Sequence, residues 1–152
     1  MNKPYIPKEI SWLSFNERVL QEAENKEAPL MERLKFMGIY SNNLDEYFRV
    51  RVATLKRISL FGPRSRKILG YNPKTTLKKI HEIVLIQTAK FEKDYSRLLK
   101  ELENQHVHII NEKQLTQDQE EFVKNYLHRK VRTRLMPYLI DKDSEFPNLT
   151  DD

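Results

Sequence analysis

The longest regular feature of the sequence is an apolar stripe between residues 73 and 103. Its side chains recur at spacings of three, four or seven residues, which is the period of one face of an α-helix. They are Leu77, Ile80, Val84, Phe91, Tyr95, Leu98 and Leu102. Asn72 and Pro73 precede the stripe as a cap and a first-turn residue. A helix of roughly 30 residues is about 45 Å long. The stripe therefore predicts one long helix along which shorter helices pack as a bundle.

Shorter helical patterns precede this stripe, and breaks separate them. Residues 14–24 and 29–37 each place apolar side chains at helical spacing. Gly38 follows the second pattern, and glycine is a common residue just beyond a helix C-terminus. The pattern resumes after Asn42 and Asn43. We expect one helix to end at Gly38 and another to begin at the asparagine pair.

Two later segments lack a helical stripe. Residues 61–73 hold two glycines and two prolines, which predicts an exposed connection. Residues 107–110 and 136–140 are short apolar runs of the strand type. Between these runs, Thr116 and Gln119 have the spacing of a capping box at a helix start.

The expected fold class is mainly α. Residues 1–103 should form an antiparallel helical bundle with one long helix, and residues 104–152 should form a truncated α/β segment. The two strand-type runs have no partner strands in the sequence, so we expect the chain to be a fragment of a larger protein.

Composition limits the possible chemistry. The chain has 152 residues, no cysteine and a formal net charge of +5. The absence of cysteine excludes disulfides, thiolate catalysis and cysteine-ligated metals. No apolar run approaches the roughly 18 residues of a membrane-spanning helix. We expect a cytoplasmic protein without a transmembrane segment, with peripheral contact with the inner membrane left open.

Basic residues dominate outside the acidic end of the chain. Five acidic side chains lie within residues 141–152, so the remainder is more basic than the net charge indicates. A basic surface attracts polyanions such as nucleotides, polyphosphate, nucleic acid or acidic lipids. A solvated basic face without a ligand explains the same pattern.

No catalytic motif is present. The sequence contains no phosphate-binding glycine loop, no nucleophile elbow and no zinc-protease motif. His106 and His108 share one side of a strand-type run but have no carboxylate pattern beside them, and His81 and His128 have no triad partners at a suitable spacing. We predict no catalytic residue and no metal ligand in this chain.

Two features leave alternatives open. One of Asn42 and Asn43 is explained as a helix cap, but a second amide could instead contact the edge of an adenine base. Arg51 falls among apolar positions on a helical wheel, so it should be shielded. It should then either pair with a neighbouring carboxylate or point into a cleft that receives phosphates.

Two stretches carry a family resemblance. "KEISWLSFNERVLQEA" and "PLMERLKFMGIYSNNLDEYFRVRVA" closely resemble the start of bacterial polyphosphate kinase, the phosphohistidine-forming family that transfers the terminal phosphate of ATP to inorganic polyphosphate. The resemblance is strongest over residues 8–57. It continues more weakly through "INEKQLTQDQ" to "MPYLI", whereas residues 61–73 depart from the pattern.

The resemblance implies a helical N-terminal domain over residues 1–103 and the beginning of a head domain over residues 104–152. It implies that Asn43 contacts adenine and that Phe36 forms an apolar wall of the same pocket. It also implies ATP or ADP as the nucleotide, inorganic polyphosphate as the second substrate, and a homo-oligomeric full-length enzyme. The phosphorylated histidine and the Mg²⁺ ligands are expected in later domains, so this segment alone should be inactive.

Two other functions remain as alternatives. A basic helical module could bind polyanions or nucleic acid through phosphates, although the resemblance leads us to expect no nucleic-acid partner. Such binding would weaken steeply with salt and show no preference for adenine. The bundle could instead serve only to join subunits.

Overall fold

The computed structural model describes residues 6–142 and residue 147. Contacts between residues divide the chain into two units, residues 1–108 and residues 109–152, and each is described by itself. Regular secondary structure in the described residues is helical throughout. The prediction of a mainly α fold is confirmed.

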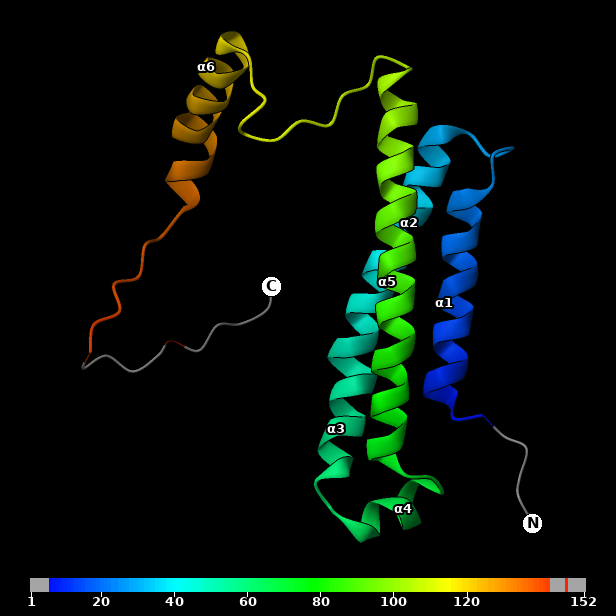
Figure 1. Ribbon diagram of the computed structural model, residues 1–152. Helices are drawn as coiled ribbons and strands as arrows, with labels where there is room; N and C mark the ends of the chain where they lie inside the picture. Colours follow the sequence, from blue (N-terminus) through cyan, green and yellow to red (C-terminus); the bar gives the residue numbers. More distant parts are fainter. Residues whose placement is uncertain (1–5, 143–146, 148–152) are drawn as a thin grey trace. The chain divides into compact units, whose positions relative to one another are not determined.

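The first unit is an antiparallel bundle (Figure 1). Helix α1 runs in one direction, the chain returns through α2 and α3, and α5 runs parallel to α1. The bounds are α1 Lys8–Glu24, α2 Leu30–Glu46, the π-helical segment η1 Tyr47–Val52, α3 Ala53–Ser59, α4 Pro63–Leu69 and α5 Pro73–Glu103.

Helix α5 is the predicted long helix, with 31 residues. Asn72 caps it, because its side-chain oxygen accepts a hydrogen bond from the backbone nitrogen of Lys74 at 3.1 Å. Pro73 occupies the first turn as expected. Ile80, Leu98 and Leu102 from the apolar stripe are buried.

The core consists of two apolar clusters along α5. One cluster is centred on Leu20, Ala23, Met37, Tyr40, Leu98 and Leu102. The other is centred on Ile10, Leu13, Tyr47, Leu55 and Ile80. Leu44 packs against both clusters, so the two form a continuous seam between α1, α2–α3 and α5.

The predicted break between Gly38 and Asn43 is wrong. Helix α2 passes through both positions without interruption. Met37 and Tyr40 are buried on either side of Gly38. Glycine within a helix costs about 1 kcal/mol relative to alanine, and burial of a large side chain contributes about 1.5–3 kcal/mol. Packing therefore outweighs the local preference to stop, and neither Asn42 nor Asn43 starts a helix.

The regular α-helix is interrupted later, at η1. The backbone N–H of Ala53 donates to the carbonyl oxygen of Phe48, five residues earlier, as in a π-helical turn. The core side chains follow this wider turn. In a regular α-helix the core residue after buried Tyr47 would be residue 51, four positions on, but it is half-buried Val52, five positions on. Arg51 is exposed. The prediction that Arg51 is shielded is wrong, because the helical wheel assumed uniform α-helical spacing.

The glycine-rich connection after α3 contains a short helix. Gly62 and Gly70 flank α4 and have φ angles of +59° and +77°, a region that side chains other than glycine rarely adopt. Most of residues 61–73 are exposed, as predicted for a connection, but residues 63–69 are helical rather than irregular. Ser65 of this helix is buried.

The second unit contains α6 Gln117–Tyr126, the π-helical segment η2 Leu127–Val131 and the 3-10 turn η3 Arg132–Arg134. The capping box of Thr116 and Gln119 is confirmed. Residues 107–110 and 136–140 form no strand. Strand pairing requires a partner strand, and the described residues supply none. The truncated α/β segment stays a prediction.

Candidate functional site

A polar layer crosses the bundle between its two apolar clusters. The side-chain nitrogen of Asn16 donates to the carbonyl oxygen of Tyr40 at 3.1 Å, and the side-chain nitrogen of Asn43 donates to Oδ1 of Asn16 at 3.0 Å. Gln87 of α5 continues the layer, accepting from the Tyr40 hydroxyl at 3.4 Å and donating to the Leu13 carbonyl at 3.3 Å. Each central polar group therefore has a partner, as burial requires.

Asn16 is completely buried, whereas Asn43 is half-buried. The Tyr40 carbonyl can only accept a hydrogen bond, so Asn16 must turn its nitrogen toward Tyr40 and its oxygen toward Asn43. Asn43 must then present its nitrogen to Asn16. One N–H of Asn43 is engaged in this way, and its Oδ1 and second N–H are not part of that hydrogen bond.

The second predicted site residue, Phe36, lies seven positions before Asn43 on α2, so the two residues share a helix face. Phe36 is half-buried and packs against the cluster around Met37 and Leu98. Together the residues present an aromatic surface and an amide edge along one side of α2. That pairing of an apolar wall with a donor and an acceptor is the chemistry that recognises a purine base.

Tyr40, which lies between Phe36 and Asn43 on α2, is buried and stacks on Phe91 with ring centroids 5.5 Å apart. Burial, together with the charge of Glu17, raises the pKa of Tyr40 to about 12. Its hydroxyl therefore stays protonated at neutral pH and serves as a donor to Gln87.

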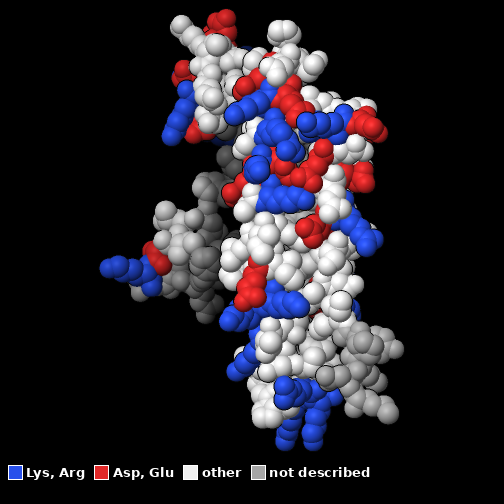
Figure 2. Space-filling model, turned by 45° about the vertical axis from the view of Figure 1, so that its right-hand side comes forward, with Lys and Arg blue, Asp and Glu red and all other residues white. Residues whose placement is uncertain are grey.

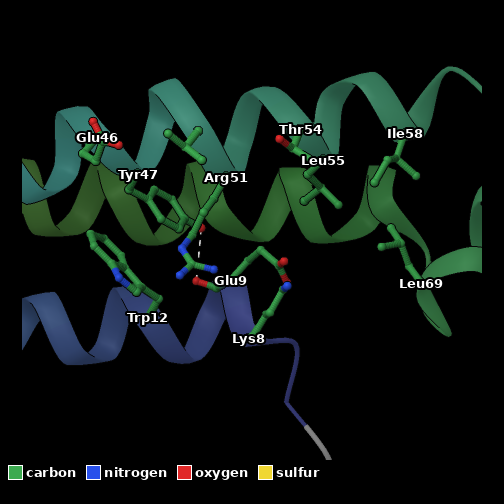
Figure 3. A pocket seen from close by; sticks show the side chains of 11 residues that line it. Lys8, Glu9, Trp12, Glu46, Tyr47, Arg51, Thr54, Leu55, Ile58 and Leu69 are labelled. Atoms are coloured by element: carbon green, nitrogen blue, oxygen red, sulfur yellow. Dashed lines mark hydrogen bonds between the residues drawn. The ribbon is translucent and has the colours of Figure 1, made fainter.

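A separate open pocket of about 460 Å³ lies between α1 and the η1–α3 segment (Figure 3). Trp12 stacks on Tyr47 at its wall, with centroids 4.6 Å apart and an interplanar angle of 10°. The backbone oxygen of Glu9 accepts from the Tyr47 hydroxyl at 3.1 Å, and its carboxylate accepts from the Tyr71 hydroxyl at 2.7 Å. Burial and the Glu9 charge raise the pKa of Tyr47.

Arg51 lines this pocket with Lys8, Glu9 and Glu46 (Figure 3). The pocket lining therefore combines side chains of both charges with apolar ones, among them Leu55, Ile58 and Leu69. Neither Asn43 nor Phe36 lines it. The structure thus separates Arg51 from the two predicted nucleotide contacts.

A basic surface covers the end of the first unit formed by α3 and α4. Residues 47–81 contain ten lysines and arginines and no acidic residue. Figure 2 shows basic side chains without acidic neighbours at this lower end, while both signs mix farther up. Seven of these ten basic residues lie within residues 49–67, and all seven are exposed: Arg49, Arg51, Lys56, Arg57, Arg64, Arg66 and Lys67.

The four histidines are exposed: His81 lies on α5, His128 lies on η2, and His106 and His108 share the connection between α5 and α6. Only His106 and His108 are close in sequence, and His106 has a positive φ of +59° instead of the extended backbone expected for a strand. Among the described residues, no group of three or more His, Asp or Glu side chains could hold a metal ion. In the same part of the chain, no helix is long and apolar enough to cross a membrane.

Sequence reasoning missed Asn16 and Glu9. Asn16 lies 27 positions before Asn43, and Glu9 lies 38 and 62 positions before its two tyrosine partners, so no local spacing links them. A buried Asn16 was nevertheless detectable in principle, because it occupies the core side of the α1 stripe between Leu13 and Leu20.

Comparison with known proteins connects this architecture to one family. The family model described as the polyphosphate kinase N-terminal domain matches residues 5–110. The polyphosphate kinase of Escherichia coli K12 is 43% identical over 149 residues, covering 94% of this chain and 20% of the relative. The polyphosphate kinases of Yersinia pestis and Vibrio cholerae are each 42% identical, covering 93% of this chain and 20% of the relative.

No solved structure matches the chain significantly. The chain spans about one fifth of the length of these curated relatives. The match to the family model covers most of the chain and includes the whole helical bundle with its asparagine layer. The chain therefore belongs to the polyphosphate kinase family, where it corresponds to the N-terminal domain and the residues that follow it.

Proposed function

We propose that this chain is the N-terminal part of an ATP:polyphosphate phosphotransferase and that it supplies one wall of the adenine site. Asn43 contacts the base edge, and Phe36 packs against the base. The observation that carries this proposal is the state of Asn43: it is half-buried, held by Asn16 at 3.0 Å, and retains an amide oxygen and a second N–H for a ligand.

Phosphoryl transfer itself is assigned to parts of the enzyme outside this segment. Transfer from ATP requires a group to receive the phosphoryl and, in this class of reaction, Mg²⁺ to neutralise its charge. The described residues do not group suitable ligands for the ion. We place the phosphorylated histidine and the Mg²⁺ ligands in later domains, so the full-length protein is the phosphoprotein and this segment alone is inactive.

The remaining features of the proposal concern the whole enzyme. ATP and inorganic polyphosphate are its substrates, which agrees with the name of the relatives. We propose a cytoplasmic homo-oligomer. The bundle contributes to its assembly surface through exposed apolar side chains such as Leu85 and Ile86 on α5.

The adenine contact is tested by comparing two adjacent asparagines in the full-length enzyme. Asn43→Ala should lower the ratio of kcat/KM for ATP to that for GTP by about two- to tenfold, as expected for one hydrogen bond of roughly 0.5–1.5 kcal/mol. Asn42→Ala is the matched control, because Asn42 is an exposed residue of the same helix. An unchanged ratio in a folded Asn43→Ala enzyme would refute the contact.

A second candidate function is supported by the acid-free run of residues 47–81. This basic end of the bundle could hold a polyanion through phosphates alone. Such binding should weaken steeply as salt increases and should not distinguish adenine from guanine. Titration of the chain with single-stranded nucleic acid and with polyphosphate at several salt concentrations separates this function from base recognition.

A further inference from the structure

We infer that Asn16 is the positioning residue that makes the site at Asn43 prefer adenine to guanine. The inference rests on the proposed function, since it assumes that Asn43 contacts the base. It goes further by identifying a buried residue that does not touch the ligand and that sets which hydrogen-bonding group Asn43 offers.

The orientation of Asn43 is decided by a chain of three groups. It begins at the carbonyl of Tyr40, which belongs to the helix backbone and cannot donate. Asn16 donates to it at 3.1 Å and is thereby left with its oxygen facing Asn43, whose nitrogen lies 3.0 Å away. A reversed Asn43 amide would place two acceptor oxygens against each other in a site where Asn16 is completely buried. Repulsion without water to relieve it excludes that orientation.

The fixed orientation has a consequence for base selection. With its nitrogen committed to Asn16, Asn43 directs its oxygen away from Asn16 and can accept a hydrogen bond there. Adenine carries an amino group at C6, which donates, whereas guanine carries a carbonyl oxygen at the same position, which only accepts. An amide that could turn freely would offer either group and would not distinguish the two bases. Asn16 removes that freedom.

Two substitutions of Asn16 distinguish its effect on the orientation of the Asn43 amide from its effect on the stability of the fold. In Asn16→Asp the carboxylate can accept from Asn43 but cannot donate to Tyr40. In Asn16→Leu both hydrogen bonds are lost, while the branching at Cγ and the number of side-chain heavy atoms are kept. Both variants should lower the thermal midpoint of the full-length enzyme. Only Asn16→Leu should lower the ATP-to-GTP ratio of kcat/KM, by about two- to tenfold, as one hydrogen bond allows.

Gln87→Leu is the matched control. Gln87 is 2% exposed and belongs to the same polar layer, but its hydrogen bonds go to Tyr40 and Leu13 and not to Asn43. This substitution should lower the thermal midpoint and leave the nucleotide ratio unchanged. A ratio that falls in Gln87→Leu as it does in Asn16→Leu would overturn the inference, because general loosening of the core would then explain both.

A double-substitution cycle completes the test and does not depend on Asn16→Asp being folded. If Asn16 acts through Asn43, adding Asn16→Leu to Asn43→Ala should leave the nucleotide ratio where Asn43→Ala alone puts it. A further drop would overturn the inference. If Asn43→Ala alone changes nothing, the proposed adenine contact fails. If Asn43→Ala lowers the ratio and Asn16→Leu does not, the contact stands and the role of Asn16 is refuted.

Discussion

Arg33 of α2 and Glu101 of α5 form an ion pair that joins three helices. The guanidinium donates to the Glu101 carboxylate, and its Nε donates to the carbonyl oxygen of Ala23 in α1 at 2.9 Å. Arg33 is 3% exposed, so its charge depends on these two acceptors rather than on water. The pair therefore fixes the end of the bundle at which α1 and α5 both terminate.

The ion pair predicts a pH dependence of folding. The Arg33 hydrogen bond, against the opposing effect of burial, lowers the pKa of Glu101 below its ordinary value of 4.5. A carboxyl group with a lowered pKa in the folded state stabilises the fold above the unfolded pKa, and this contribution is lost as pH falls through the folded pKa. Glu101→Gln should therefore lower the unfolding midpoint at pH 7, and its difference from the parent should shrink below about pH 4.5.

Glu103→Gln is the control for this measurement, because Glu103 is an exposed residue on the same helix. Thermal unfolding, followed by circular dichroism between pH 3 and pH 7, gives the unfolding midpoint of the parent and of each variant as a function of pH. A difference between the parent and Glu101→Gln that stays constant over this range would contradict the role given to the Glu101 charge.

Arg33→Met should destabilise the fold more than a surface substitution does. The change removes the donor to Ala23 and the partner of Glu101, and hydrogen bonds to charged groups contribute about 1.5–3 kcal/mol. Lys35→Met is the matched control, since Lys35 pairs with Glu32 on an exposed surface, where ion pairs contribute about 0–1 kcal/mol. Equal free energies of unfolding for the two variants would show that the contacts of Arg33 stabilise the fold no more than an exposed ion pair does.

The extra residue in η1 predicts that one deletion is tolerated. Removing Arg51 brings Val52 to the fourth position after Tyr47 and restores α-helical spacing to the core side chains. Removing Lys35 instead rotates Met37 and Tyr40 by about 100° away from the core. The first variant should stay folded with a small change in midpoint, and the second should unfold or lose several kcal/mol. Unfolding of the Arg51 deletion would show that the π-helical turn itself is required.

Substitution of Asn43 by aspartate should destabilise the fold. If Asn43 were a helix cap, aspartate would replace it without cost. Because Asn43 lies inside α2 and donates to Asn16, Asn43→Asp instead places a carboxylate against an amide oxygen, and it should cost about 1–3 kcal/mol. Asn42→Asp should stay within about 0.5 kcal/mol of the parent. Chemical denaturation of both variants measures the difference.

The elements predicted correctly are those with strong local signals. The stripe of α5, its Asn72 cap and the Thr116 capping box depend on residues within a few positions of one another. Gly38 and Asn43 also carried local signals, but those signals were overridden by burial of Tyr40 and its neighbours. Local preferences of about 1 kcal/mol decide a boundary only where packing does not oppose them.

Less of the candidate site could be predicted from the sequence. Asn43 and Phe36 were identified by family resemblance, while the partner that orients Asn43 comes from another helix 27 positions away. Arg51 was misplaced because a single π-helical turn shifts every later position on the wheel. Contacts between helices and irregular turns both require the tertiary structure, since no period in the sequence encodes them.

The described part of the chain should not transfer phosphate by itself. All four histidines are exposed, and within the described residues no Asp or Glu cluster could hold Mg²⁺ beside any of them. Asn43 and Phe36 are proposed to contact a base, but neither side chain can accept a phosphoryl group. Purified chain incubated with ATP, Mg²⁺ and polyphosphate should release no more ADP than buffer does. A turnover that follows the protein through successive columns, and that is lost when one of the four histidines is replaced by alanine, would place part of the chemistry in this segment.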